Sequence, residues 1–373
     1  MRILTLSNCL LHANEGSGQV ILSLTQGLRQ RGHDVDLYGP DDYEICRGLR
    51  PRANAYRQAL GMWRFARARL REYPYDLLEI YGGEGWLTFL ALARQKTLRP
   101  LLVAHSNGLE PHVRFCLKHI DHQRRRWWQL DHSPWMARGF RCVDGLVVVS
   151  DFDREFALRQ SYQPEDNLVT VKPGLAPEFL GLPLNLERQA VIGYCGNWLP
   201  IKGIDLIARA LPQIMREFTR VKLLLVGVGN EFRITDWFPA DVTARIEAIP
   251  WLDRRADLIA QYQRMAIAIR PSYYESFGLA AAEAMACGAA VISSQGGFGG
   301  ALRHGKDGLV LNPLNADSLA AACRQLLSDD ALRQRIAAAG RLRVQSLRWE
   351  HSITRLAHIY ERWLAQHKRR AFN

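Results

Sequence analysis

Short apolar segments alternate with helical patterns along both halves of this 373-residue chain. Strands that alternate with helices form parallel sheets joined by crossover helices, so the sequence predicts an α/β fold with two such sheets. The expected strands of the first sheet are residues 1–6, 34–38, 77–81, 101–105 and 145–150, and those of the second are 191–195, 222–226, 267–270 and 290–293. Ligands of parallel sheets bind at the carboxyl ends of the strands.

The segment 173–185 is rich in proline and glycine, which favours a hinge between two domains. We therefore expect an N-terminal Rossmann-like domain over residues 1–180 and a C-terminal Rossmann-like domain over residues 186–354. The two domains are expected to face a central cleft.

Composition argues against several classes of protein. No apolar stretch reaches the roughly 18 to 20 residues that span a bilayer, and residues 1–7 are predicted to form a first strand and not a secretory signal. The seven cysteines include no Cys-x-x-Cys motif, which favours reduced thiols and argues against structural zinc. We expect a cytoplasmic protein without a metal site.

The net charge of +12 is concentrated in residues 47–141, which hold 18 Lys and Arg against 7 Asp and Glu. Aromatic side chains stand among these charges: Trp63 and Phe65 beside Arg64, Arg67, Arg69 and Arg71, and Trp127 and Trp128 beside Arg124, Arg125 and Arg126. This combination suits the inner face of an anionic membrane, although it also fits an ordinary solvated face. No recognition motif accompanies the charge, so nucleic acid is not an expected partner.

Glu283 lies within the apolar run 279–287, where a carboxylate has no local partner. A buried unpaired charge is costly, so either a cationic partner, such as an arginine, or the hydroxyls of a ligand should face it. Glu275 lies in the loop 271–278, directly before the helix that carries Glu283. The amides and the dipole at a helix N-terminus bind anions. A sugar nucleotide has both a hydroxyl-rich part and an anionic part, and therefore fits this segment.

The same segment carries a family resemblance. Its ordered motifs are Glu275-Ser276-Phe277-Gly278-Leu279, then Glu283-Ala284-Met285-Ala286-Cys287-Gly288, and then Ala290-Val291-Ile292-Ser293-Ser294 with Gly296-Gly297. This order resembles the signature of family 4 retaining glycosyltransferases, which have the GT-B fold. The resemblance implies that the first domain binds the acceptor and is completed by a C-terminal helix over residues 355–373. It also implies that the second domain binds the nucleotide-sugar donor, with Glu275 near the sugar and Glu283 at the ribose hydroxyls.

The loop 196–203 joins a strand to a helix, where Lys202 can neutralise a diphosphate. In the family, an arginine and a lysine act together at this place. Lys202 matches the lysine, but Asn197 stands at the arginine position, which weakens leaving-group stabilisation or shifts it to backbone amides. Alternatively, Lys202 is an ordinary exposed loop lysine and Asn197 is an ordinary turn residue.

Three further assignments rest on the resemblance. The glycine-rich loop Gly16-Ser17-Gly18 matches a loop that contacts the donor phosphate, although a mere turn is the alternative. His105 matches a histidine that meets the donor sugar or the acceptor, and its alternative is a structural cap. Trp251 lies in the segment expected near the base.

Two further motifs suggest other ligands, and one position departs from the family pattern. Asp151-Phe152-Asp153 resembles the Asp-x-Asp motif that holds Mn²⁺ in GT-A glycosyltransferases, but Ser150 and Asp153 also have the spacing of a helix N-cap, which we favour. The glycines of the turn 227–230 lack the third glycine of a dinucleotide loop, so NAD is not expected. Gly300 stands where many relatives have an acid.

Together these features predict a metal-independent retaining hexosyltransferase without a cofactor. Its donor is expected to be a UDP-sugar such as UDP-glucose, with a GDP-sugar as the alternative. Its acceptor is expected to be a sugar or a lipid-linked sugar in bacterial polysaccharide or glycolipid assembly. The alternatives are a sugar-nucleotide epimerase of the GT-B type and a catalytically silent sugar-nucleotide binding protein.

Overall fold

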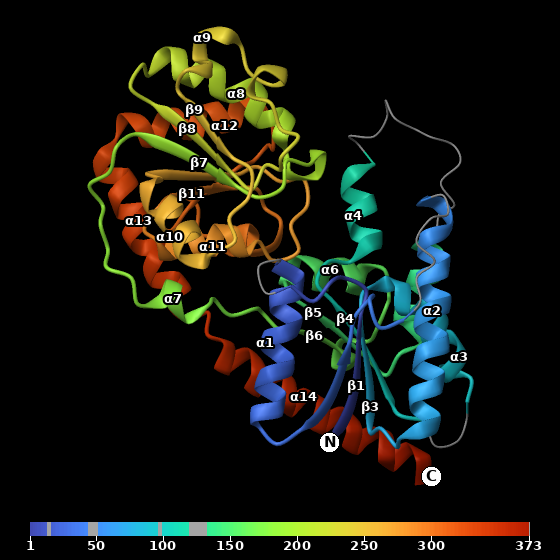
Figure 1. Cartoon of the computed structure of the whole chain (residues 1–373). Helices are drawn as coiled ribbons and strands as arrows, with labels where there is room; N and C mark the ends of the chain where they lie inside the picture. Colours follow the sequence, from blue (N-terminus) through green and yellow to red (C-terminus); the bar gives the residue numbers. More distant parts are fainter. Residues whose placement is uncertain (13–15, 44–50, 96–98, 119–132, 373) are drawn as a thin grey trace. The chain divides into compact units, whose positions relative to one another are not determined.

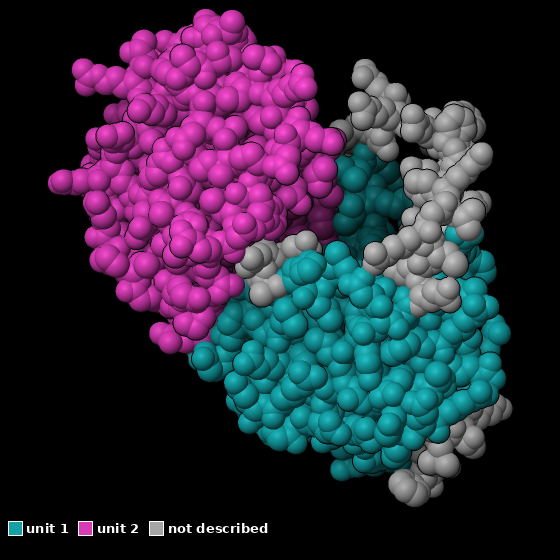
Figure 2. All heavy atoms as spheres, in the orientation of Figure 1, with its two compact units in different colours: residues 1–174, 349–373 teal, residues 175–348 magenta. Residues whose placement is uncertain are grey.

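The computed structural model describes residues 1–12, 16–43, 51–95, 99–118 and 133–372. The chain divides into two compact units, shown in teal and magenta in Figure 2. Unit 1 consists of Met1–Gly174 and Trp349–Asn373, and unit 2 consists of Leu175–Arg348. The boundary between Gly174 and Leu175 therefore falls inside the proline- and glycine-rich segment 173–185. Within the described ranges, no helix combines the length and the apolar character that a membrane span requires.

Unit 1 is built on a six-stranded parallel sheet in the order β2-β1-β3-β4-β5-β6 (Figure 1). Its strands are β1 (Arg2–Ser7), β2 (Asp34–Tyr38), β3 (Leu77–Tyr81), β4 (Leu101–Ser106), β5 (Gly145–Val148) and β6 (Leu168–Thr170). Its helices are α1 (Gly16–Gln30), α2 (Pro51–Glu72), α3 (Trp86–Ala93), α4 (Glu110–Leu117), α5 (Ser133–Cys142), α6 (Asp151–Arg159) and α14 (Trp349–Phe372). The central strands are apolar and buried on both faces, as expected for a sheet covered by helices on two sides.

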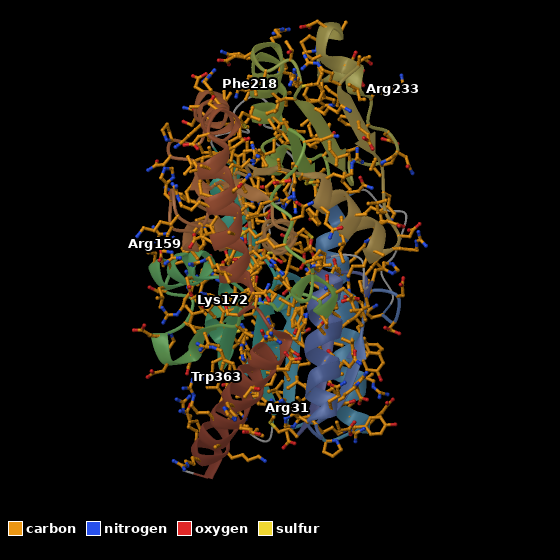
Figure 3. The ribbon with its side chains drawn as sticks, turned by 90° about the vertical axis from the view of Figure 1, so that its left-hand side faces the viewer. Arg31, Arg159, Lys172, Phe218, Arg233 and Trp363 are labelled. Atoms are coloured by element: carbon orange, nitrogen blue, oxygen red, sulfur yellow. The ribbon has the colours of Figure 1, made fainter. Side chains whose placement is uncertain are left out.

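The last helix, α14, belongs to unit 1 and packs against α1 and β4 (Figure 1). Trp363 of this helix (labelled in Figure 3) is 2% exposed, and its indole N–H donates to the backbone oxygen of Asp166 at 3.2 Å. A Cβ atom on Gly145 would lie 2.3 Å from the Trp363 ring, so the absence of a side chain at Gly145 admits the indole. The C-terminal helix thus forms part of the core of unit 1.

Unit 2 is built on a second six-stranded parallel sheet, in the order β12-β11-β10-β7-β8-β9. Its strands are β7 (Val191–Cys195), β8 (Lys222–Val226), β9 (Ile246–Ile249), β10 (Ile267–Arg270), β11 (Ala290–Ser293) and β12 (Leu309–Val310). Its helices are α7 (Pro177–Leu180), α8 (Ile204–Glu217), α9 (Ala240–Thr243), α10 (Arg255–Arg264), α11 (Leu279–Ala286), α12 (Ala316–Ser328) and α13 (Asp330–Val344). The two parallel sheets with flanking helices confirm the predicted α/β class with two Rossmann-like domains.

The order of strands in unit 2 places a topological switch between β7 and β10. The chain runs from β7 to β8 and β9 on one side of the sheet and then returns to β10 on the other side of β7. Loops that follow two such strands diverge at their carboxyl ends, and ligands of open parallel sheets bind there. A ligand is therefore expected to bind at the segments that follow Cys195 and Arg270.

Candidate functional site

Two loops of unit 2 meet at the carboxyl ends of β7 and β10. The backbone N–H of Tyr273 donates to the carbonyl of Ile201 at 2.9 Å, which joins the loop after β10 to the loop after β7. Gly203 has a φ of +70°, and a Cβ atom there would lie 2.0 Å from the carbonyl oxygen of Pro271. Glycine at this position therefore lets the two loops approach closely.

Glu275 lies between two cations at this junction. The Lys202 ammonium donates to both of its carboxylate oxygens, at 2.7 and 2.9 Å, and the Arg270 guanidinium donates to Oε1 at 2.6 Å. Glu275 is 6% exposed. Burial by itself would raise the pKa of Glu275, but Arg270 and Lys202 outweigh it and hold the pKa below its ordinary value. The carboxylate is therefore ionised at neutral pH.

The cluster also contains a residue that was not predicted. Arg270 is the last residue of β10 and is 6% exposed. Its guanidinium donates to the carbonyl of Cys195 as well as to Glu275. An arginine at the end of an apolar strand was the available signal, but the sequence does not tell whether such a side chain turns inward.

Glu283 lies on α11, and its partner comes from α10. The Tyr262 hydroxyl donates to Oε2 of Glu283 at 3.0 Å. Burial raises the pKa of Glu283, although this hydrogen bond and the nearby charges of Arg255 and Arg270 oppose the shift. Among the residues that the structure describes, no arginine forms an ion pair with Glu283, so a core ion pair does not account for this carboxylate.

The start of α11 rests on a glycine-rich segment. Gly278 precedes the helix with a φ of +90°, a conformation that favours glycine. The carbonyl of Phe277 accepts a bond of 2.6 Å from the amide of Phe298. Ser276 and Leu279 are half-buried on either side of the turn. The amides of the first turn of α11 have no carbonyl partner within the helix, as at any helix N-terminus, and can bind an anion.

Gly300, which stands where many relatives have an acid, lies in a place with little room for a side chain. A Cβ atom on Gly300 would lie 2.4 Å from the carbonyl oxygen of Gln295. A side chain here would force the backbone of the segment to move.

Asn197 and Trp251 lie on the surface of unit 2. Asn197 is exposed, and its backbone carbonyl accepts a bond of 2.7 Å from the Tyr194 hydroxyl. Trp251 follows β9, is 47% exposed, and donates from its indole N–H to Asp253 at 3.0 Å. Both side chains are therefore accessible to a ligand of this unit.

The expected phosphate loop of unit 1 is helical. Gly16, Ser17 and Gly18 form the first turn of α1. A Cβ atom on Gly18 would lie 2.4 Å from the carbonyl oxygen of His12, so this glycine allows close packing of the preceding segment. Asn14 and Glu15, which directly precede this loop in the sequence, lie outside the described residues.

His105 is buried in unit 1 and has no exposed surface. Its Nδ1 lies 2.8 Å from the Glu79 carboxylate, and its ring stacks on Tyr81 with centroids 4.3 Å apart. Nε2 is buried without a hydrogen-bond partner in the described structure. β4 continues through His105 to Ser106, so the histidine does not end the strand as expected. The structure thus places His105 in a buried network with Glu79 and Tyr81 near the carboxyl end of β4.

The helix-cap interpretation of the Asp151-Phe152-Asp153 motif is confirmed. Ser150 is the N-cap of α6, and its hydroxyl accepts from the amide of Asp153 at 3.3 Å. Asp151 forms an ion pair with Lys172 at 2.8 Å, and Asp153 contacts His112 at 2.7 Å. In the described part of the chain, no group of three or more His, Cys, Asp or Glu is arranged to hold a metal ion.

Two sequence profiles match successive parts of the chain. The profile described as Glycosyltransferase Family 4 matches residues 14–179, and the profile described as Glycosyl transferases group 1 matches residues 189–329. The matches correspond broadly to the two units of the fold.

Several curated proteins are similar in sequence. The D-inositol 3-phosphate glycosyltransferase of Corynebacterium aurimucosum is 31% identical over 80% of this chain and 74% of its own length. An uncharacterised glycosyltransferase of Methanocaldococcus jannaschii is 25% identical over 91% of this chain and 92% of its own length. The match to the D-inositol 3-phosphate glycosyltransferase of Rhodococcus opacus, at 31% identity, spans 53% of this chain and 46% of that relative.

Solved structures share the fold. The sucrose-phosphate synthase of Thermosynechococcus elongatus superposes with a TM-score of 0.80 at 21% identity, over 98% of this chain and all of that chain. Anabaena HepE, solved in complex with UDP and glucose, superposes with a TM-score of 0.62 at 16% identity, over 96% of this chain and 98% of that chain.

Proposed function

Because the chain belongs to glycosyltransferase family 4, we propose that it moves a hexose from a nucleoside diphosphate sugar to an acceptor hydroxyl, with retention at the anomeric carbon. The observation that carries this proposal is the arrangement around α11. Lys202, Glu275 and Arg270 meet before the helix, and the carboxylate of Glu283 lies on the helix itself. This segment offers the Lys202 ammonium, helix amides and carboxylates to one ligand that is anionic at one part and rich in hydroxyls at another.

Each group has a distinct role in the proposed donor site. Lys202 and the amides at the start of α11, around Phe277 and Gly278, bind the diphosphate. Glu283 accepts hydrogen bonds from the ribose hydroxyls, Glu275 lies near the hexose, and exposed Trp251 packs on the base. A UDP-sugar is our preferred donor, and the UDP and glucose bound to Anabaena HepE support that choice.

Catalysis in this proposal consists of stabilising the leaving group. Negative charge grows on the diphosphate as the glycosidic bond stretches, and Lys202 meets that charge at short range. A single preorganised donor of this kind is worth about a hundredfold or more in rate. The leaving phosphate itself accepts the proton of the acceptor hydroxyl, and no metal ion takes part.

We assign the acceptor to unit 1. The imidazole of His105 is fully buried and bound to Glu79, so it supports the carboxyl end of β4. Ser17 and Gly16 are exposed at the start of α1 and remain candidates for ligand contact.

A peripheral contact with an anionic membrane is part of the proposal for unit 1. Arg64, Arg67 and Arg71 are exposed along one face of α2, with Leu60 beside them. Phe65 instead packs inward, with its ring 4.8 Å from that of Tyr38. Trp127, Trp128 and the arginines at 124–126 lie outside the described residues. Sedimentation should recover the protein with anionic but not neutral vesicles, less so with added salt, and equal recovery in every supernatant would contradict the contact.

A panel of nucleotide sugars tests the activity. Thermal shift identifies the donor, and product analysis with sugar and lipid-linked acceptors in the presence of EDTA follows the transfer. We expect a glycosidic product with retained configuration and release of the nucleoside diphosphate. A free epimer as the product would identify an epimerase, and donor binding without turnover would identify a silent binding protein. Loss of activity in EDTA that Mn²⁺ restores would contradict the metal-free mechanism.

A further inference from the structure

Arg270 brings a second buried charge to the proposed donor site, beside Glu275. It is 6% exposed and ends β10, adjacent to β7 in the sheet. The guanidinium lies beneath the turn after β7, where a Cβ atom on Gly196 would come within 2.9 Å of Nη1. The glycine at position 196 therefore leaves room for the arginine.

The contacts of Arg270 hold it away from a ligand. Nη1 donates to the carbonyl of Cys195, Nη2 donates to Glu275, and the guanidinium lies 5.7 Å from the centre of the Tyr194 ring. Nε is buried and has no hydrogen-bond partner among the described residues. Arg270 can therefore act on a bound diphosphate through its charge and through Glu275, without a hydrogen bond of its own to the ligand.

The charges of the cluster show what that effect is. Lys202 alone with Glu275 would form a neutral pair, with the ammonium bound to both carboxylate oxygens. Adding Arg270 gives two cations around one carboxylate, and the cluster then has a net positive charge. Asn197, which stands at the position of the family's arginine, adds no charge.

We propose that Arg270 supplies the positive charge that Asn197 lacks, by neutralising Glu275 so that Lys202 can turn to the diphosphate of the donor. This inference rests on the proposed function and makes Arg270 a positioning residue of the donor site. Because Arg270 and Glu275 are buried, their charges are weakly screened and act strongly over short distances.

The competing explanation is that Arg270 only ties β10 to β7 through the Cys195 carbonyl. The two explanations differ in what an arginine at position 197 would do. A charge placed at Asn197 can replace the electrostatic contribution of Arg270, but it cannot replace a hydrogen bond to Cys195.

The test measures the affinity of the full chain for UDP and GDP by titration calorimetry, together with kcat and KM for the donor. Arg270→Met should weaken binding of the nucleoside diphosphate by about tenfold or more, and should lower kcat. Asn197→Arg in the Arg270→Met background should restore most of the affinity, and Asn197→Arg alone should tighten binding. Arg333→Met removes an equally buried arginine of unit 2, paired with Asp330, and should leave the affinity unchanged.

A further variant keeps the test informative if Arg270→Met does not fold. Arg270→Lys retains the charge and should keep affinity within about threefold of the wild type. A lysine cannot donate to both the Cys195 carbonyl and the Glu275 carboxylate as the guanidinium does. Wild-type affinity in Arg270→Met would overturn the inference. So would an Arg270→Lys variant as weak as Arg270→Met, or a failure of Asn197→Arg to restore binding. A wild-type chain that binds neither UDP nor GDP would instead contradict the proposed donor site as a whole.

Discussion

Glu283 carries a carboxylate whose surroundings determine the pH at which it can bind a hydroxyl-rich ligand. Burial raises its pKa above the ordinary value of 4.5, and the Tyr262 hydroxyl and nearby arginines only partly oppose this. A raised pKa means that the carboxylate takes up a proton sooner as the pH falls. The protonated acid can no longer accept hydrogen bonds at both oxygens, so we expect donor binding to weaken on acidification.

Replacement of Glu283 by glutamine should separate binding from chemistry. In the proposed site Glu283 holds the ribose equally in the ground state and the transition state, so Glu283→Gln should raise KM about tenfold with little change in kcat. The wild-type KM should rise as the pH falls toward the raised pKa of Glu283, and this dependence should be absent in the variant. Glu187→Gln, which changes an exposed carboxylate of unit 2, is the control. An unchanged KM in Glu283→Gln would remove Glu283 from the donor site.

At the scale of residues, sequence reasoning reached part of the candidate site. It selected Lys202 and Glu275, which stand 73 residues apart in the chain and meet at 2.7 Å. It missed Arg270, because a charged residue that ends an apolar strand can turn either to solvent or inward. It did not predict that Nδ1 of His105 lies 2.8 Å from the carboxylate of Glu79 on the neighbouring strand. Such pairings depend on strand register, which one sequence does not reveal. The ligand contact assigned to His105 stays a prediction.

The loop elements of unit 2 depend on a glycine after Lys202. Gly203 combines a positive φ of +70° with a close approach to the carbonyl of Pro271. Gly305 of the same unit has a similar φ of +74°, but nothing lies within 4 Å of the Cβ position there. An alanine at position 305 would therefore meet only the cost of a positive φ, whereas an alanine at position 203 would also meet a steric contact.

Gly203→Ala should destabilise unit 2 more than Gly305→Ala does. A positive φ alone costs an alanine about 1–2 kcal/mol, and the contact with Pro271 adds to that cost only at position 203. Chemical denaturation followed by fluorescence measures the difference, and Gly203→Ala should also lower donor turnover because the Lys202 loop shifts. Equal stability of the two variants would show that the loops can separate at little cost.

Most elements were predictable, and the failures share a physical cause. All nine expected strands are present, several with the expected bounds, including β3, β7 and β10. The strands that were not predicted are β6, β9 and β12, and each lies at an edge of its sheet. An edge strand is partly exposed to solvent and needs no continuous apolar run. β9 illustrates this, because only Ile246 of its four residues is buried.

At the scale of the whole molecule, the C-terminal helix α14 packs into unit 1, the unit that also contains the N-terminal residues. α14 contributes Trp363 to the core of unit 1, and Tyr360 of the same helix donates to the Glu79 carboxylate between the strands. The return of this helix was expected only from the family resemblance. An amphipathic helix shows that it has a partner surface, but its sequence does not say which unit provides that surface.

Trp363→Ala should therefore destabilise unit 1 from a position near the C-terminus. Loss of a fully buried tryptophan costs about 3–5 kcal/mol. Well below the melting temperature, affinity for UDP should be unchanged, because the proposed donor site lies in unit 2. Leu342→Ala, at a side chain that is 75% exposed, provides the control for stability. A Trp363→Ala variant with wild-type stability would show that α14 adds little to the core of unit 1.

The central claim is that unit 2 binds a nucleotide sugar where β7 and β10 end and uses Lys202 to stabilise the departing diphosphate. The measurement that tests it most directly is the rate of nucleoside diphosphate release during transfer, for the wild type, Lys202→Ala and Lys222→Ala. Lys222 is an exposed lysine at the amino end of β8, whereas the proposed site lies at the carboxyl ends of the strands, and it serves as the matched control. We predict that Lys202→Ala lowers kcat by about a hundredfold or more, while Lys222→Ala keeps the wild-type rate. Equal kcat values for Lys202→Ala and the wild type would contradict the account.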